Sequence, residues 1–259
     1  MLILLPPSEG KTPARRGKPL DLGALSFPDL TTPRQQVLDS LLDLCRGDVE
    51  TARKALGLPP GLADLVHRNA ALDHAPTARA DHVYTGVLYD ALALPDLAAD
   101  ARRRATSRLA VVSSLFGLVR PGDRIPAYRL SGDASLPGLG AVAGVWRASL
   151  DPVVRDAAGS GLVVDLRSTT YAAFWRPAAD LARRVVTVRV LHETGGKRTV
   201  VSHFNKATKG RLVRGLLEDG ANPGSVRALA ATLERLGWQA DVGEQGRHGT
   251  QVDVVVSEV

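Results

Sequence analysis

Short β-branched runs and longer helical stripes alternate along this chain. The apolar run at residues 2–5 predicts a buried strand, and the prolines at positions 6 and 7 end it because they offer no backbone donor to a sheet. Because helical patterns lie between the apolar runs, we expect one α/β domain over residues 1–259, with a mixed central sheet covered by helices on both faces. Further strands are predicted at residues 109–114, 162–166, 185–190, 199–203 and 252–256.

The clearest helical stripe follows Thr32 and Pro33, which predict an N-cap and a first helical position. Gly47 ends this helix. Its apolar positions are Val37, Leu38, Leu41, Leu42 and Cys45. The same periodicity predicts longer helices at residues 86–105, 141–158, 205–219 and 223–236.

Two short predicted helices, at residues 48–56 and about 61–72, flank a segment with the sequence Leu56-Gly57-Leu58-Pro59-Pro60-Gly61. This pattern fits a helix–hairpin–helix, in which turn amides and a helix N-terminus hold a DNA phosphate without reading the base sequence. An ordinary corner between two helices explains the pattern about as well. The two prolines also remove amides that the DNA-binding motif would use.

The single cysteine restricts the chemistry available to the protein. Cys45 cannot form a disulfide within the chain or work with a resolving thiol, and its position on an apolar stripe predicts a core residue. The lack of a disulfide framework favours the cytoplasm, and the N-terminus has neither the features of a signal peptide nor an apolar run long enough for a membrane span. The six histidines are scattered without metal-ligand spacing, so we expect no metal and no cofactor.

Lysine and arginine outnumber acidic residues by 33 to 27, which gives a net charge of +6. This excess suits a polyanionic partner such as DNA, although an ordinary solvated surface also accounts for it. Gly10-Lys11-Thr12 resembles the end of a phosphate-binding loop, but prolines replace the residues whose amides would cradle phosphate, which argues against nucleotide hydrolysis. A Ser-His-Asp hydrolase using His203 is disfavoured because the chain has no G-x-S-x-G motif.

The segment from Ser113 to Leu130 carries the densest set of candidate site residues. Its glycines and prolines predict a stiff loop after a buried strand. The two guanidiniums and the tyrosine of this loop offer bidentate anion recognition and a stacking surface, while its aspartate either pins the turn or takes part in the chemistry. These residues are Arg120, Asp123, Tyr128 and Arg129.

A second set of polar groups follows the predicted strand at 162–166. Here Asp165, an arginine and three hydroxyl groups, among them that of Ser168, come together at a strand end. Open α/β sheets commonly bind ligands at this position, so the segment is a candidate binding site.

The third set lies on the predicted helix at 205–219. Lys209 falls inside the apolar arc of this helix, so its side chain either snorkels to solvent or points into a polar cavity near Lys206. Arg211 and Arg214 lie on the opposite face, either as solvated side chains or as contacts to a phosphate backbone.

These segments resemble the YaaA family of bacterial peroxide-stress proteins. The resemblance implies a family-specific α/β fold with a positively charged cleft and a helix–hairpin–helix-like element that binds DNA, favouring distorted DNA over plain duplex. It also implies that the protein limits oxidative damage by keeping intracellular free iron low. The matching segments, in family order, are Lys11-Thr12, Val83-Tyr84-Thr85-Gly86 with Tyr89, Ser113 to Leu130, Trp146, Asp165 to Tyr171, and Lys206 to Arg214.

Two departures from the commoner family pattern alter the predicted cleft. The family's Pro-Ala-Lys-Thr is replaced by the two-residue-longer Pro7-Ser8-Glu9-Gly10-Lys11-Thr12. Its Asn-Leu-Ala-Ser is replaced by Asp165-Leu166-Arg167-Ser168. A different small ligand or a specialised role is compatible with both changes.

Two functional hypotheses follow. The first is a DNA-binding stress protein whose anion-binding residues are Lys11, Thr12, Arg120, Arg129, Ser168, Lys206, Lys209, Arg211 and Arg214. The second is an enzyme acting on a nucleotide-like or other anionic small molecule, in which Asp123 or Asp165 serves as acid or base and Tyr128 donates a proton or stacks.

Overall fold

A computed structural model describes residues 1–200 and 202–257, with the backbone alone described at residues 202 and 203. The helices are α1 (Thr31–Arg46), α2 (Val49–Ala55), α3 (Asp64–Ala70), α4 (Ala80–Val83), α5 (Val87–Leu92), α6 (Ala99–Arg108), α7 (Val142–Ala158), α8 (Thr169–Ala172), α9 (Ala179–Ala182), α10 (Ser202–Asp219) and α11 (Val226–Arg235). The strands are β1 (Leu2–Leu5), β2 (Ala78–Arg79), β3 (Leu109–Ser113), β4 (Gly117–Val119), β5 (Arg124–Ile125), β6 (Ser135–Leu136), β7 (Gly140–Ala141), β8 (Val163–Asp165), β9 (Val185–Thr194), β10 (Lys197–Thr199), β11 (Gln239–Gly246) and β12 (Gly249–Val256).

A mixed eight-stranded sheet forms the centre of the fold. Its order is β11-β12-β9-β8-β1-β3-β4, and β10 pairs with β9 as a hairpin. The strands β3, β1, β8, β9 and β12 are mutually parallel, whereas β4 and β11 are antiparallel edges. Because β1, β3 and β8 run in the same direction, the loops that follow them leave the sheet at one edge.

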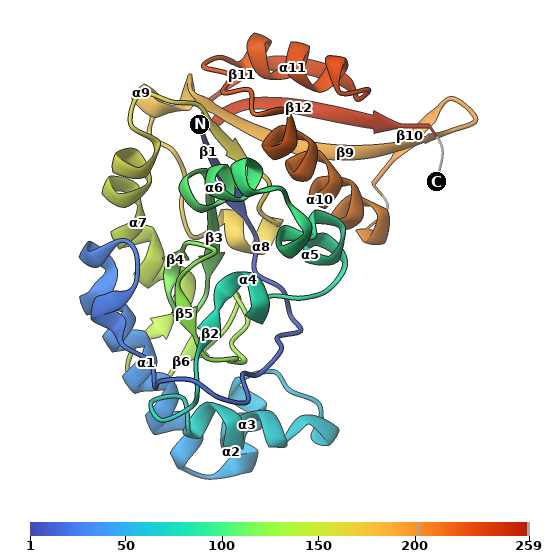
Figure 1. The fold of residues 1–259 in the computed structure, drawn as a ribbon. Coiled ribbons are helices and arrows are strands. Elements are labelled where there is room, and N and C mark those ends of the chain that lie inside the picture. Colours follow the sequence, from blue (N-terminus) through green and yellow to red (C-terminus); the bar gives the residue numbers. More distant parts are fainter. Residues whose placement is uncertain (201, 258–259) are drawn as a thin grey trace.

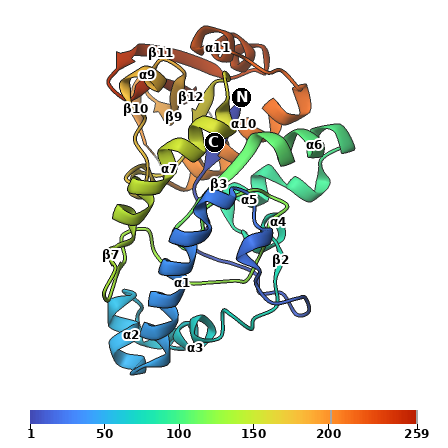
Figure 2. The same ribbon diagram turned by 90° about the vertical axis from the view of Figure 1, so that its left-hand side faces the viewer.

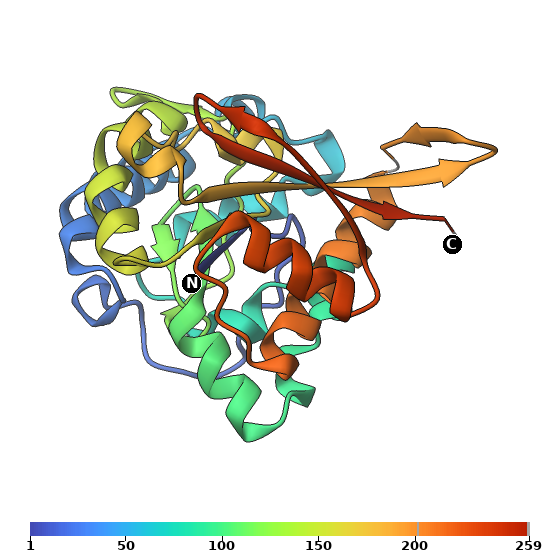
Figure 3. The same ribbon diagram turned by 90° about the horizontal axis from the view of Figure 1, so that it is seen from above.

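Helices cover both faces of this sheet (Figures 1 and 3). On one face α10 packs closely against α5 and also contacts α6 and β9, while α7 and α9 lie on the other side. The helices α2 and α3 pack against α1 at the far end of the molecule, and α1 also contacts α7 (Figure 2). The long β9 and the β10 hairpin extend beyond the helical layers (Figure 3). The architecture is therefore the predicted single α/β domain with a mixed sheet.

Most predicted elements are present, and the N-terminal strand and the helix at 141–158 match closely. The predicted helix at 86–105 is wrong, because Ala93 adopts a left-handed conformation (φ 45°) and Pro95 follows in a 3-10 turn, Leu94–Asp96, so that two helices form instead. The first long helix begins at Thr31, continuing a 3-10 turn at Pro28–Leu30, so Thr32 is not its N-cap. Gly47 ends that helix as predicted.

The predicted strand at 199–203 is also wrong. The short β10 ends at Thr199 and α10 begins at Ser202, while residue 201 lies outside the described part of the chain. Gly195 and Gly196, both with positive φ, turn the chain back after β9, so the β-branched residues that follow belong to a hairpin.

The turn between α2 and α3 does not show a helix–hairpin–helix. The amides of Gly57 and Leu58 bond to carbonyls at the end of α2, and Pro59 and Pro60 have no amide hydrogen. The α3 helix is one of seven residues without a side-chain N-cap. A tight corner between two short helices describes this segment.

Candidate functional site

Two adjoining pockets lie where β1 and β8 end, beneath the first half of α10. Their volumes are about 440 Å³ and 310 Å³. Both pockets are lined by Pro6, Leu88, Ser168 and Lys206, so they form one groove, and we call it the carboxyl-edge groove. Residues as far apart in the sequence as Pro6 and Gln251 meet there, because parallel strands end at the same edge of the sheet.

Lysines of α10 supply positive charge to this groove. Lys206 is exposed, and no hydrogen bond or ion pair engages it within the described residues. Lys209 lines the larger pocket and donates a hydrogen bond from Nζ to the Leu166 carbonyl at 3.1 Å. Burial lowers the pKa of Lys209, and the nearby charge of Asp165 opposes that shift. Lys206 is therefore the side chain available to an incoming anion, whereas Lys209 is partly committed to the protein.

Asp165 and Arg167 form a buried ion pair under the groove. The guanidinium donates from Nε and Nη2 to the two carboxylate oxygens at 2.8 and 2.7 Å, and it also bonds to the carbonyls of Tyr171 and Trp175. Burial alone would raise the pKa of Asp165, but the charge and hydrogen bonds of Arg167 outweigh it and hold the pKa below its ordinary value. This carboxylate is saturated with partners, so the geometry does not support the hypothesis that Asp165 acts as an acid or base.

Lys11 lies within a cluster of tyrosines beside the smaller pocket. Its Nζ is 4.3 Å from the ring centre of Tyr128 and 5.6 Å from that of Tyr84. The Tyr128 hydroxyl is 3.1 Å from the Tyr84 hydroxyl and 2.8 Å from Ser113 Oγ. Burial lowers the pKa of Lys11 to about 7, with Glu9 opposing and Arg129 adding to the shift. An amine in this setting is partly neutral near physiological pH.

The Ser8–Gly10 loop fills the space between the predicted cations Lys11, Arg129 and Lys206. The amine of Lys11 donates to the Ser8 carbonyl at 2.6 Å, and the Glu9 carboxylate pairs with the Arg129 guanidinium. The outer side of the same loop lines the smaller pocket together with Lys206. These three cations therefore surround the Ser8–Gly10 loop, which is part of the protein and not a ligand.

The structure places Arg120 and Asp123 away from the groove. Arg120 donates to the carbonyls of Ser107 and Leu109, at the amino end of β3, which is the opposite edge of the sheet. Asp123 accepts hydrogen bonds from Ser26 and from the Arg120 amide, so it pins the turn that follows β4. The geometry therefore favours a structural role for Asp123 over a role in the chemistry.

The remaining predicted anion-binding residues are dispersed. The Arg214 guanidinium donates to the carbonyls of Leu92 and Ala93 and pairs with Glu218 at 2.8 Å, which ties α10 to the end of α5. Arg211 is exposed on α10, and Thr12 is exposed beside the bridge between Lys11 and Tyr84. The side chain of His203, a candidate for hydrolase chemistry, lies outside the described side chains.

Sequence reasoning missed two participants at the groove. Glu9, the partner of Arg129, belongs to the two-residue insertion, and no motif or periodicity in the sequence indicated a role for it. Arg189 lies on β9 and lines the larger pocket, where it pairs with Asp253 of β12. Its alternation with inward-facing valines marks it as outward-facing, but only the parallel pairing of β9 and β12 reveals its partner.

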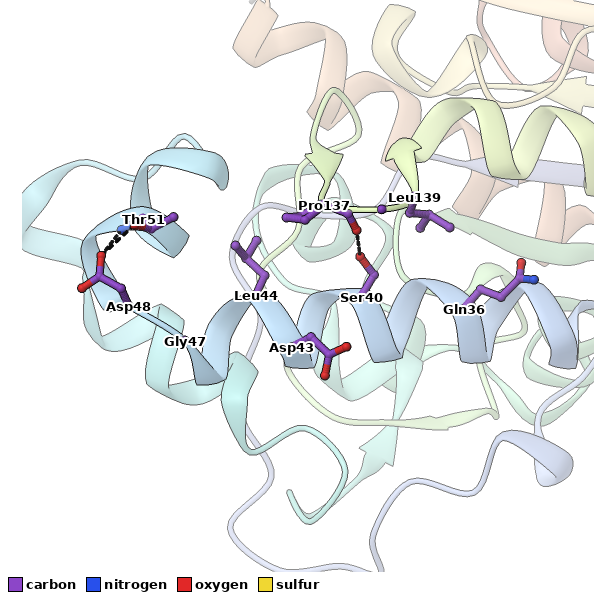
Figure 4. Close-up of a pocket in the computed structure, with 10 residues that line it drawn as sticks. Gln36, Ser40, Asp43, Leu44, Gly47, Asp48, Thr51, Pro137 and Leu139 are labelled. Atoms are coloured by element: carbon purple, nitrogen blue, oxygen red, sulfur yellow. Dashed lines mark hydrogen bonds between the residues drawn. The ribbon is translucent and has the colours of Figure 1, made fainter.

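A larger pocket, of about 680 Å³, lies elsewhere, between α1 and the β6–β7 hairpin (Figure 4). Its charged lining residues are the carboxylates Asp43 and Asp48, and Asp48 is occupied in capping α2 through Thr51. Ser40 bonds to the Pro137 carbonyl, which closes one side of the pocket. A site lined by carboxylates and lacking a cation repels anions, so it is not a candidate for the predicted ligand.

The described residues contain no group of three or more histidine, cysteine, aspartate or glutamate side chains placed to hold a metal ion. No described helix is long and apolar enough to cross a membrane.

Comparison with known proteins agrees with the sequence resemblance. A family model described as "Peroxide stress protein YaaA" matches residues 1–242. A UPF0246 protein of Streptomyces coelicolor is 51% identical over 261 residues and covers all of both chains. A UPF0246 protein of Corynebacterium efficiens is 42% identical over 259 residues, covering 98% of this chain and all of its own. The chain therefore belongs to the YaaA peroxide-stress family, also called UPF0246.

Proposed function

We propose that this protein acts in peroxide stress by binding DNA through the carboxyl-edge groove, and that this binding helps to limit iron-driven damage. The observation that carries the DNA-binding proposal is Lys206, an exposed cation with no partner among the described residues, which lines an open groove together with Ser168. A net charge of +6 adds a long-range attraction for a polyanion. The limitation of iron rests on the family resemblance alone.

The form of the groove favours unpaired over paired DNA. Pockets of about 440 and 310 Å³ accept a single nucleotide, whereas a duplex is too wide to enter either of them. The aromatic Tyr89 and Tyr171 line the smaller pocket, and the cationic Lys206 lines both. Both tyrosine rings are buried against other aromatic side chains, so the pocket size and the charge of Lys206 are what make a bubble or a frayed end suit the groove better than plain duplex.

The α2–α3 corner is a separate possible contact with DNA phosphates, and a pair of variants distinguishes it from the groove. Lys206→Glu places a negative charge in the groove, and Lys54→Glu does the same on the exposed face of α2. We expect Lys206→Glu to abolish gel-shift binding to a DNA bubble and Lys54→Glu to leave it unchanged. Unchanged binding by the Lys206 variant would discard the groove, and loss with the Lys54 variant would move the DNA site to the corner.

A second candidate function is suggested by the volume of the same groove. A nucleotide or another anionic small molecule would contact Lys206 and Ser168 and be surrounded by the walls of the smaller pocket. A thermal-shift panel of nucleotides and phosphorylated metabolites tests this idea, because a ligand that binds the native state raises the melting temperature. The Lys206→Glu variant should lose any such shift, and a flat panel combined with tight DNA binding would favour the first function.

A further inference from the structure

Lys11 is a partly buried lysine whose surroundings are unusual for this residue type. Within the described residues, its amine makes one hydrogen bond, to the Ser8 carbonyl, and lies against the Tyr84 and Tyr128 rings. No carboxylate within the described residues forms an ion pair with it, because the neighbouring Glu9 is bound to Arg129. A charged ammonium is poorly solvated in such a place, which favours the neutral amine.

A short loop separates this amine from the smaller pocket. Ser8 holds the loop closed, since its hydroxyl bonds to the Gly10 carbonyl at 2.5 Å and accepts from the Thr85 amide at 3.1 Å. The ion pair between Glu9 and Arg129 forms a latch on the outside, where 62% of the Glu9 side chain is exposed. Opening the loop breaks these contacts and the bond from Lys11 to the Ser8 carbonyl, and it would join the Lys11 amine to the pocket.

We propose that Lys11 is the nucleophile of a covalent site for small aldehydes or ketones that carry an anionic group, and that Ser8–Gly10 is its lid. The cations Arg129 and Lys206 flank the loop and the pocket, and they select an anionic group on the ligand. Tyr84 and Tyr128 keep their protons, because burial raises the pKa of both hydroxyls. The amine is therefore the basic nucleophile of the cluster, and the hydroxyls are proton donors.

The reaction balances without an oxidant or a metal. The lone pair of the Lys11 nitrogen forms a bond to the carbonyl carbon, while the carbonyl π electrons move to oxygen. A proton passes from nitrogen to that oxygen, which gives a carbinolamine, and loss of one water molecule then forms the imine. Addition of water reverses each step and returns the free amine and the carbonyl compound.

Pyridoxal 5′-phosphate followed by cyanoborohydride tests the site, because reduction fixes any imine as a stable amine that peptide mass spectrometry locates. We expect Lys11 to be labelled in the full-length protein in preference to the exposed Lys18. Glu9→Gln removes the latch and should raise the labelling rate of Lys11 by about threefold, the scale set by a partly exposed ion pair, with Lys18 unaffected. Arg129→Gln breaks the same latch but also removes a cation that binds the phosphate, so it should raise the labelling rate with phosphate-free pyridoxal and not with pyridoxal 5′-phosphate.

Two controls separate the parts of the proposal. Lys11→Met removes the amine without placing a permanent charge among the tyrosines, and it should remove the label at this position while the circular dichroism spectrum stays unchanged. Pyridoxal without its phosphate should label Lys11 more slowly, and an equal rate would overturn the requirement for an anionic group. Labelling of Lys11 no faster than Lys18, in the wild type and in both latch variants, would overturn the site itself, whatever the outcome for DNA binding.

Discussion

At the scale of single residues, Asp165 and Arg167 form a buried ion pair in which each side chain depends on the charge of the other. Both side chains are nearly fully buried, at 8% and 2% exposure, and each satisfies the charge of the other. A buried charge without its partner is expensive, whereas removing both charges together is much less so. Asp165→Asn is therefore a poor probe of ligand binding, because it weakens the fold beneath the groove.

Arg167→Ala tests this ion pair. We expect it to lower the free energy of unfolding by about 3–5 kcal/mol, because it leaves the Asp165 carboxylate buried and unpaired. The double variant Asp165→Leu with Arg167→Met removes both charges and should recover most of that loss. Urea unfolding measures both effects, and a single variant as stable as the wild type would contradict the assignment of a buried pair.

Lys11 predicts a specific pH dependence of stability. Its pKa is about 7 in the folded protein and 10.5 in an unfolded reference, so between these values the unfolded chain binds more protons. The free energy of unfolding should therefore rise with pH above about 7, and this contribution is lost as the pH falls through the folded pKa. Lys11→Met should flatten the rise, which urea titrations at pH 6 to 9 would detect, before the tyrosines ionise.

Lys18→Met is the matched control for that experiment. Lys18 is exposed, so its replacement should leave the pH dependence as it is in the wild type. Identical slopes for the Lys11 variant and the wild type would show that the Lys11 amine stays charged throughout this range.

At the scale of elements, the crossing of α10 over α5 positions the lysines of the groove. A Cβ added at Gly210 would lie 2.3 Å from the Leu88 carbonyl oxygen and 3.0 Å from the Leu92 nitrogen, both of them backbone atoms. The two helices therefore approach closely only because this residue has no side chain. Lys206 and Lys209 lie one turn or less before the crossing.

Gly210→Ala should destabilise the protein by about 1–3 kcal/mol, because the helices must separate to accept the methyl group. Gly215→Ala on the same helix is the matched control, since its Cβ would meet Leu236 Cδ1 at an ordinary 3.7 Å. That control should be neutral or stabilising by up to about 1 kcal/mol, the difference in helix propensity. Chemical denaturation of both variants measures the contrast, and equal effects would refute a tight crossing at Gly210.

Helices and strands with a strong apolar periodicity were predicted well from the sequence. Elements that depend on a local change in backbone conformation, or that have no apolar pattern, were not. The apolar pattern of β1 and α7 is unambiguous, so both were placed within a residue or two. The break at Ala93 depends on a left-handed conformation that no pattern of apolar residues announces. Likewise, the β11 strand is almost wholly exposed, so hydrophobicity gave no signal for it.

At the scale of the whole molecule, the proposed binding of DNA to the groove should depend on salt concentration. Each phosphate neutralised by a lysine releases counterions, so the logarithm of affinity falls with the logarithm of salt concentration. Lys206→Ala should reduce the magnitude of that slope for a DNA bubble by about 1, the contribution of one phosphate contact. Binding isotherms across a salt series measure the slope, with Lys54→Ala as the control that should leave it unchanged.

The sequence by itself determined the α/β class, the strand ends that carry polar groups and the family, because periodicity and motifs are local properties of the chain. It also indicated the candidates Lys11, Ser168, Arg129, Lys206 and Lys209, which the fold brings to one edge. Only the tertiary structure decided that Arg120 lies at the opposite edge and that Asp165 is neutralised by Arg167. Which groups share a surface depends on strand order and on helix crossings, and these arise from packing between segments far apart in the chain.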